Sequence, residues 1–192
     1  VETSDHAGMV GQHIGSAPLW YFKRETPFTR PGPAIRKLLR QFEDPGTSSG
    51  DAPRLHALSA LVRGAVAYQV GQTGVTTTAE EALNAGHGVC QDHAHLFITL
   101  ARMLGYPARY VSGYLLMNDR VDQDAGHGWA EVHAQGLGWV GFDVSNGYSP
   151  DERYVRVATG LDYREAAPIA GITFGRGNEA MTVTLQVQQV QQ

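Results

Sequence analysis

Residues 86–105 read Gly-His-Gly-Val-Cys-Gln-Asp-His-Ala-His-Leu-Phe-Ile-Thr-Leu-Ala-Arg-Met-Leu-Gly, and this stretch decides the fold. Its glycines form a flexible turn, after which apolar residues recur at helical spacing from Cys90 to Leu104. Gly105 and Pro107 then end the pattern. The sequence therefore predicts a mostly buried central helix that begins close to Cys90. Its polar face is predicted to hold Gln91, His95, Thr99 and Arg102.

Cys90 is the only cysteine of the chain. A helix start concentrates unpaired backbone N–H groups and partial positive charge, which favour a thiolate over a thiol. The thiolate is the nucleophilic form of cysteine. A free cysteine is also often a small buried hydrophobe. The preceding glycines and the helix start favour the nucleophile.

Helical patterns precede this stretch. We expect helices over residues 34–42 and 53–70, separated by a surface loop at residues 45–50. Thr78 and Glu81 match the capping box that opens a helix, and Gly86 is placed to end that helix.

Strand patterns follow it. The β-rich, turn-bounded segments are residues 108–116, 128–134, 139–144 and 154–158. Residues 135–138 read as a hairpin connection. Residues 181–187 alternate apolar and polar side chains, as a half-buried strand does. Helices followed by antiparallel strands predict an α+β domain, with the helices packed on the sheet.

Composition bounds the class of protein. The 192 residues are 42% hydrophobic and 18% charged, which is typical of one globular domain. A net charge of -4 without a lysine and arginine cluster argues against nucleic acid as a partner. No apolar run is long enough to span a membrane, so no membrane partner is expected. A single cysteine cannot form an internal disulfide, which favours the cytoplasm.

His127 and Asp143, which follow Cys90 later in the chain, complete a nucleophilic site. His127 opens one predicted strand and Asp143 lies near the end of the next, so their side chains can meet across the hairpin. Cys90 would then attack, His127 would move the proton, and Asp143 would orient the imidazole. The alternatives are a structural histidine at position 127, with His133 as its rival on the same strand face, and a turn residue at position 143.

Four motifs in order resemble the bacterial transglutaminase-like family, which shares the papain-like cysteine-protease core. They are Gly-Val-Cys-Gln-Asp-His-Ala-His-Leu at 88–96, Leu-Gly-Tyr-Pro-Ala-Arg-Tyr-Val-Ser-Gly-Tyr at 104–114, His-Gly-Trp-Ala-Glu-Val at 127–132 and Gly-Trp-Val-Gly-Phe-Asp at 138–143. The similarity is strong over residues 54–147 and weaker beyond. Gly128, Val144 and Leu161 depart from the family's usual residues, and none of these positions belongs to the triad.

The resemblance implies several roles. It assigns Cys90, His127 and Asp143 to a catalytic triad and favours His127 over His133. Asp92 and Arg109 match further family positions, which suggests a supporting ion pair, although a capping role for Asp92 is equally simple. The resemblance also implies an upstream β-domain, so we expect residues 1–33 to be an extended arm at its end and residues 34–192 to form the catalytic domain.

Other side chains are candidates for binding substrate. Gln91 lies beside the nucleophile, and Tyr114 and Trp129 could line a groove for an extended chain. Sheet packing is the alternative for these aromatic residues, and it is the preferred interpretation for Trp139. The backbone N–H of Cys90 is a candidate oxyanion donor.

Metal sites are the weaker interpretation of the histidine- and acid-rich stretches. His87, Cys90, His93 and His95 could bind zinc, but no second cysteine pairs with Cys90. Asn118, Asp119, Asp122 and Asp124 suggest calcium, yet a calcium-hand loop from Asp122 would place His127 where glycine is required and His133 where glutamate is required. We therefore expect no metal and no cofactor.

The sequence thus predicts thiol-dependent acyl transfer on protein or peptide amides through a thioester. Water as acceptor would make the protein a peptidase, amidase or deamidase, and a lysine-type amine would make it a transglutaminase. Hydrolysis is slightly favoured, because no feature marks an amine site. A non-catalytic peptide-binding module of the same fold and a small metal-binding protein are the alternatives.

Overall fold

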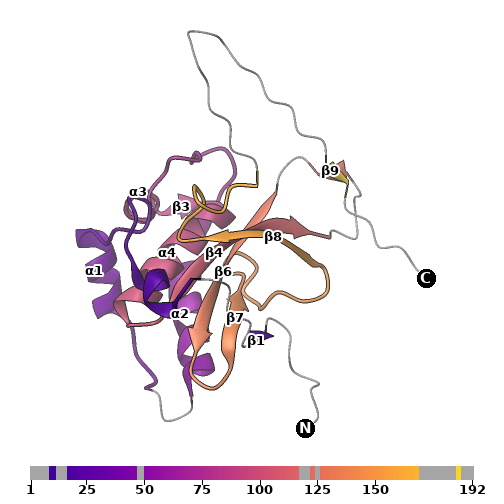
Figure 1. Ribbon diagram of the computed structural model, residues 1–192. Helices are drawn as coiled ribbons and strands as arrows, with labels where there is room; N and C mark the ends of the chain where they lie inside the picture. Colours follow the sequence, from indigo (N-terminus) through magenta and orange to yellow (C-terminus); the bar gives the residue numbers. More distant parts are fainter. Residues whose placement is uncertain are drawn as a thin grey trace.

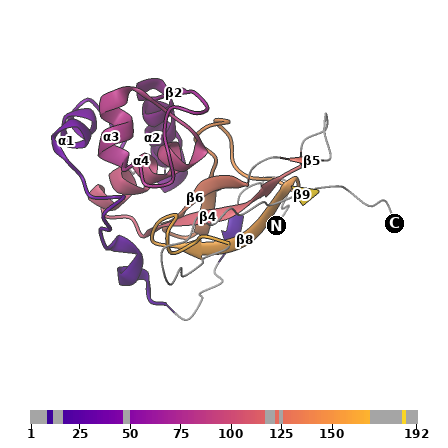
Figure 2. The same ribbon diagram turned by 90° about the horizontal axis from the view of Figure 1, so that it is seen from above.

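The helical layer comes from the first half of the chain. The structure, a computed structural model, describes residues 9–11, 17–46, 50–116, 122–123, 126–168 and 185–186. After a 3-10 helix (Leu19–Lys23), the chain forms α1 (Pro33–Arg40), α2 (Asp51–Ala65), α3 (Ala79–Ala85) and α4 (Cys90–Met103). Helices α1 to α4 lie on one side of the sheet (Figures 1 and 2).

The main sheet is antiparallel and has the order β1-β7-β6-β4-β8. Its strands are β1 (Met9–Gly11), β4 (Ala108–Leu115), β6 (His127–Ala134), β7 (Gly138–Phe142) and β8 (Tyr154–Gly160). Two short ladders join β2 (Ala67–Tyr68) to β3 (His87–Gly88) and β5 (Asp122–Gln123) to β9 (Leu185–Gln186). The α+β class and the helix-on-sheet packing predicted from the sequence are confirmed.

Most element bounds agree with the predictions, and α2 is the exception. The helix ends at Ala65 rather than at residue 70, because Val66 adopts extended backbone angles (φ -128°, ψ 116°). Ala67 and Tyr68 then pair in parallel with His87 and Gly88. The capping box of α3 is present, with the Glu81 N–H donating to Thr78 Oγ1, and Gly86 ends that helix at φ 72°. Most of the predicted strand at 181–187 and part of the 45–50 loop lie outside the described residues.

Helix α4 is the centre of the molecule. It is buried on all sides, and its apolar residues pack between α2, α3 and the inner faces of β4, β6 and β7. The predicted polar face is buried as well, because its side chains find partners within the protein. Thr99 donates to the carbonyl of His95, and His95 Nε2 accepts from the Tyr163 N–H.

Arg102 makes the largest set of these internal bonds. It is 8% exposed and donates to the carbonyls of Phe22, Ala108 and Leu161 and to Thr29 Oγ1, at 2.7–2.9 Å. Burial lowers the pKa of Arg102 to about 10, so it remains a cation at neutral pH. One side chain therefore ties the 3-10 helix, β4 and the end of β8 to α4.

Replacing Arg102 with leucine should lower the free energy of unfolding by about 3 kcal/mol, because several buried acceptors lose their donor at once. Chemical denaturation monitored by circular dichroism measures this. Arg153→Leu is the control: Arg153 pairs with the nearby Asp151 and lies over the Tyr148 ring at the surface, so its loss should leave the midpoint almost unchanged. Equal midpoints for the two variants would contradict the role given to Arg102.

Within the described part of the chain, none of the helices has both the length and the apolar character that a membrane span requires.

Candidate active site

Cys90 is the first residue of α4. The β3 strand and Val89 lead directly into the helix, and packing of α4 against β6 brings this helix start to the sheet. The side chain of Cys90 is half-buried, so its sulfur is held in place without being sealed from solvent. The placement of the cysteine at a helix start, predicted from the sequence, is thus what the structure has.

His127 and Asp143 meet at the ends of neighbouring strands. β6 pairs with β7 in the register Ala130↔Phe142 and Val132↔Val140, which places His127 and Asp143 at the same end of the hairpin. His127 Nε2 lies 2.5 Å from Asp143 Oδ2. Because Nε2 is taken by the carboxylate, Nδ1 is the ring nitrogen left for the Cys90 side chain, which also raises the pKa of His127.

The electrostatics of His127 follow from these two partners. Burial lowers the pKa of the imidazole, but the hydrogen bonds and charges of Asp143 and Cys90 outweigh it and raise the pKa to about 10. For Asp143 burial has the opposite effect and raises the pKa of the carboxyl. The hydrogen bond from His127 outweighs burial, so the pKa of Asp143 lies below its ordinary value. The pair is therefore an imidazolium facing a carboxylate at neutral pH. Such a histidine can donate a proton to a leaving group.

Tyr154 and Asn146 also hold Asp143, and sequence analysis missed both of them. Tyr154 Oη donates to Asp143 Oδ2 at 2.6 Å, and Asn146 Nδ2 donates to the same oxygen at 2.7 Å. The Tyr154 ring lies 5.8 Å from that of His127. Asn146 stands three residues after Asp143, which is the spacing of a side chain that closes a turn. The sequence offered that signal for Asn146 and none for Tyr154.

Gln91 and Asp92 form hydrogen bonds with segments that lie beside the nucleophile. Asp92 Oδ2 accepts from the Val89 N–H at 2.8 Å and from Thr73 Oγ1 at 2.6 Å, so Asp92 caps α4 as the simpler expectation had it. Gln91 Nε2 donates to the Val75 carbonyl at 3.3 Å. Both side chains are thereby engaged with protein groups.

The suspected ion pair between Asp92 and Arg109 is absent. Arg109 Nε lies 2.6 Å from Glu131 Oε2, and its guanidinium lies 3.9 Å from the centre of the Trp139 ring. The reason is register: Arg109 and Glu131 are direct partners on β4 and β6. Their side chains point away from α4, whereas Asp92 belongs to that helix. The alternative for Trp139, sheet packing, is what the structure has.

Two aromatic candidates take different positions. Trp129 is 2% exposed, and its ring lies 6.2 Å from that of His127 and 5.3 Å from that of Tyr154. A side chain so enclosed supports the imidazole rather than lining a groove. Tyr114 lies near the end of β4 and is half-buried.

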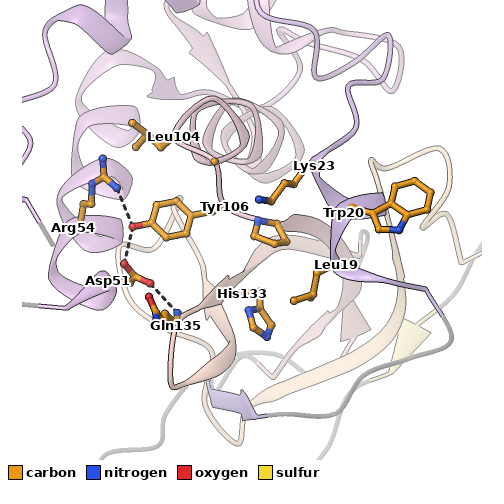
Figure 3. A pocket seen from close by; sticks show the side chains of 11 residues that line it. Leu19, Trp20, Lys23, Asp51, Arg54, Leu104, Tyr106, His133 and Gln135 are labelled. Atoms are coloured by element: carbon orange, nitrogen blue, oxygen red, sulfur yellow. Dashed lines mark hydrogen bonds between the residues drawn. The ribbon is translucent and has the colours of Figure 1, made fainter.

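His133, the rival of His127, lies in a different place. Its ring packs edge-on against Trp139 at 5.5 Å and borders a cavity of about 550 Å³ (Figure 3). That cavity lies between the 3-10 helix, the start of α2, the α4–β4 turn and the β6–β7 hairpin. Its lining residues are Leu19, Trp20, Lys23, Asp51, Arg54, Leu104, Gly105, Tyr106, Pro107, His133 and Gln135. Cys90, His127 and Asp143 do not line it, which separates His133 from Cys90.

His93, one of the histidines near Cys90, has both ring nitrogens engaged by other residues. His93 bonds the Val66 carbonyl through Nε2 and Ser145 Oγ through Nδ1. Among the side chains that the structure describes, no group of three or more histidine, cysteine, aspartate or glutamate residues is placed to hold a metal ion. Asn118, Asp119 and Asp124 lie outside the described residues, as does the side chain of Asp122.

A half-buried cysteine at a helix start beside a histidine–aspartate pair on two strands is the arrangement expected of the family that the motifs resemble. The family model described as the transglutaminase-like superfamily matches residues 37–144, more than half of the chain. The chain belongs to the transglutaminase-like superfamily. The matched residues include Cys90, His127 and Asp143.

Relatives in mycobacteria share this similarity. An uncharacterized protein of Mycobacterium leprae is 35% identical over 136 residues, which make up 68% of this chain and 48% of that protein. An uncharacterized protein of Mycobacterium tuberculosis is 39% identical over 131 residues, 62% of this chain and 42% of that protein. The transglutaminase-like chain thus spans less than half the length of these relatives.

Solved structures share the fold. A Cytophaga hutchinsonii protein described as a candidate cysteine protease superposes with a TM-score of 0.66 at 27% identity, covering 78% of this chain and 49% of that one. The periplasmic domain of TgpA from Pseudomonas aeruginosa superposes with a TM-score of 0.50 at 19% identity, covering 67% and 47%. The transglutaminase-like chain therefore has the transglutaminase and papain-like fold.

Tyr154→Phe should lower kcat/KM about tenfold, because a hydrogen bond to a charged group contributes roughly 1.5 kcal/mol or more. Loss of the hydroxyl removes a hydrogen bond that lowers the pKa of Asp143, so the pKa of Asp143 rises. The acidic limb of the pH–rate profile should therefore move to higher pH. Tyr21→Phe is the matched control, since Tyr21 Oη donates to the carboxylate of Glu165 at 2.5 Å, outside the site. A profile for Tyr154→Phe that matches that of Tyr21→Phe would contradict this role.

Proposed function

We propose that this domain transfers the acyl group of protein or peptide amides through a thioester on Cys90. The observation that carries the proposal is the hydrogen-bonded His127–Asp143 pair, beside a cysteine that begins the buried helix α4 and helps to raise the pKa of His127. Membership of the transglutaminase-like superfamily supports thiol-dependent catalysis in general terms. The particular reaction and substrate belong to the proposal.

The chemistry proceeds in two steps. The Cys90 sulfur forms a bond to the amide carbon, the carbon–nitrogen bond breaks, and the His127 imidazolium gives its proton to the departing ammonia or amine. Water or a second amine then attacks the thioester, gives up its proton to His127, and the carbon–sulfur bond breaks. The Cys90 backbone N–H stabilises the oxyanion, since an N–H at the first helical position has no partner within its helix.

The acceptor decides the class of enzyme. Water gives an amidase, deamidase or peptidase, whereas an amine gives an isopeptide cross-link. We place hydrolysis slightly ahead, because no described side chain marks a site for a second amine. We also retain the cytoplasm as the proposed compartment, on the ground of the single cysteine.

Mass spectrometry of glutamine-containing peptides, incubated with and without a small primary amine, separates these outcomes. Incorporation of the amine with loss of ammonia indicates transglutamination, exchange of the amide nitrogen for oxygen indicates deamidation, and chain scission indicates a peptidase. Cys90→Ala is the control for every product. Unchanged peptides with the wild-type protein, across all sequences offered, would contradict the proposal.

A further inference from the structure

Residues 68–77, here called the 68–77 segment, border the nucleophile and expose apolar side chains. Tyr68, Val70 and Val75 are 54%, 76% and 62% exposed. From Gly64 to Ala79 the chain carries no charged side chain, although 18% of all its residues are charged. Exposed apolar side chains that gather in one place mark surfaces for binding. The position of this segment indicates what it binds.

Three hydrogen bonds fix the 68–77 segment to the residues around Cys90. The Gln69 N–H donates to the Gly88 carbonyl at 2.8 Å, and Thr73 Oγ1 donates to Asp92 Oδ2 at 2.6 Å. Gln91 Nε2 donates to the Val75 carbonyl at 3.3 Å. Each of the anchoring residues Gly88, Gln91 and Asp92 lies within two positions of Cys90. The exposed valines are therefore held at a set place relative to the sulfur.

Tyr68 continues this surface to the triad. Tyr68 pairs with Gly88 on β3, two positions before Cys90, and burial, followed by the charges of Cys90 and Asp143, raises the pKa of its phenol. Its ring lies 6.1 Å from that of His93. His93 Nδ1 in turn bonds Ser145 Oγ at 2.8 Å, in the turn that follows Asp143.

A second exposed aromatic residue lies next to Asp143. Tyr148 is 38% exposed, and its carbonyl accepts from the Asp143 N–H. Tyr68, which pairs with Gly88 two positions before Cys90, and Tyr148 thus each present an exposed ring near the catalytic residues.

Building on the proposed acyl transfer, we propose that the 68–77 segment binds the acyl donor, an extended uncharged peptide segment. The side chain next to the reacting carboxamide is apolar and packs against Val70, Val75 and Tyr68. Burial of apolar area drives this contact. A charged side chain at the same place would lose hydration against a surface that offers it no counter-ion.

Isothermal titration calorimetry on Cys90→Ala, the full chain without its nucleophile, tests this selectivity apart from any reaction. The probes are two acetylated, amidated tetrapeptides, Gly-Leu-Gln-Gly and Gly-Ser-Gln-Gly. We expect the leucine peptide to bind about tenfold more tightly. The serine peptide lacks the apolar carbons of leucine, and a loss of that size reduces affinity by this order. Adding Val75→Ser should reduce this ratio severalfold. Val157→Ser, which alters a valine that is 49% exposed on β8, should leave it unchanged.

Equal affinity for the two peptides would overturn the proposal, and so would an equal loss of preference in Val157→Ser. Turnover by the wild-type protein separates this inference from the proposed function. A leucine preference in binding without any turnover keeps the binding surface and contradicts the acyl transfer. Turnover of both peptides with the same kcat/KM contradicts the binding surface and keeps the acyl transfer.

Discussion

Cys90→Ala should abolish turnover of amide substrates while the protein stays folded. Loss of the nucleophile leaves no thioester route, so kcat/KM should fall by at least about three orders of magnitude. The fold should persist because the side chain is half-buried and alanine is the best helix former for the first position of α4. Turnover is measured by mass spectrometry of the peptide products, and folding by circular dichroism and chemical denaturation.

The reactivity of the single cysteine can be measured directly by alkylation. Because the chain has one cysteine, the mass gained with a mild electrophile near neutral pH reports on Cys90 alone. The wild-type protein should be alkylated faster than a free thiol, and more slowly after His127→Ala, which removes the partner that stabilises the thiolate. Wild-type activity in Cys90→Ala, or a rate of alkylation indifferent to His127, would overturn the assignment of the nucleophile.

The parts of the fold that could be predicted from the sequence are those with local signals. The stripe from Cys90 to Leu104 with Gly105 after it predicted α4, and the hairpin between two β-rich segments brought His127 towards Asp143. A capping box and a glycine bounded α3. Each of these features depends on one continuous stretch of chain, so its cause can be found in the neighbouring sequence.

Features decided by tertiary pairing could not be predicted. Helix propensity would have carried α2 through Tyr68, but the ladder with His87 and Gly88 draws that segment out of the helix. The pattern assigned Arg102 to the polar face of the helix without indicating its partners, and the structure surrounds it with the carbonyls of Phe22, Ala108 and Leu161. Tyr154 reaches Asp143 only because β8 pairs with β4 at Leu115↔Tyr154. Nothing within the neighbouring sequence specifies those partners.

Asp143→Asn should lower the rate less than His127→Ala and should also change the pH dependence. Loss of the imidazole removes the proton donor and acceptor, which contributes on the order of 10⁴-fold. An asparagine can still hold the ring, so we expect a smaller loss, on the order of 10²-fold. Rates for both variants come from initial velocities on one glutamine-containing peptide.

The pH profile shows whether Asp143 stabilises the charge of His127 or only orients its ring. With the pKa of His127 raised to about 10, the imidazolium is present throughout the neutral range. The wild-type kcat/KM should therefore hold through pH 8 to 9 and fall as the pH rises through about 10. Without the negative charge of Asp143 the pKa of His127 falls, so the alkaline limb of Asp143→Asn should lie at lower pH.

Asp151→Asn is the matched control for this shift, because Asp151 is a carboxylate of the same type whose partner is Arg153 rather than His127. Its alkaline limb should coincide with that of the wild type. An Asp143→Asn profile whose limb also stays in place, with only its height reduced, would mean that Asp143 orients the ring without stabilising its charge. The imidazolium would then owe its proton to the Cys90 thiolate alone, and the triad would function as a dyad.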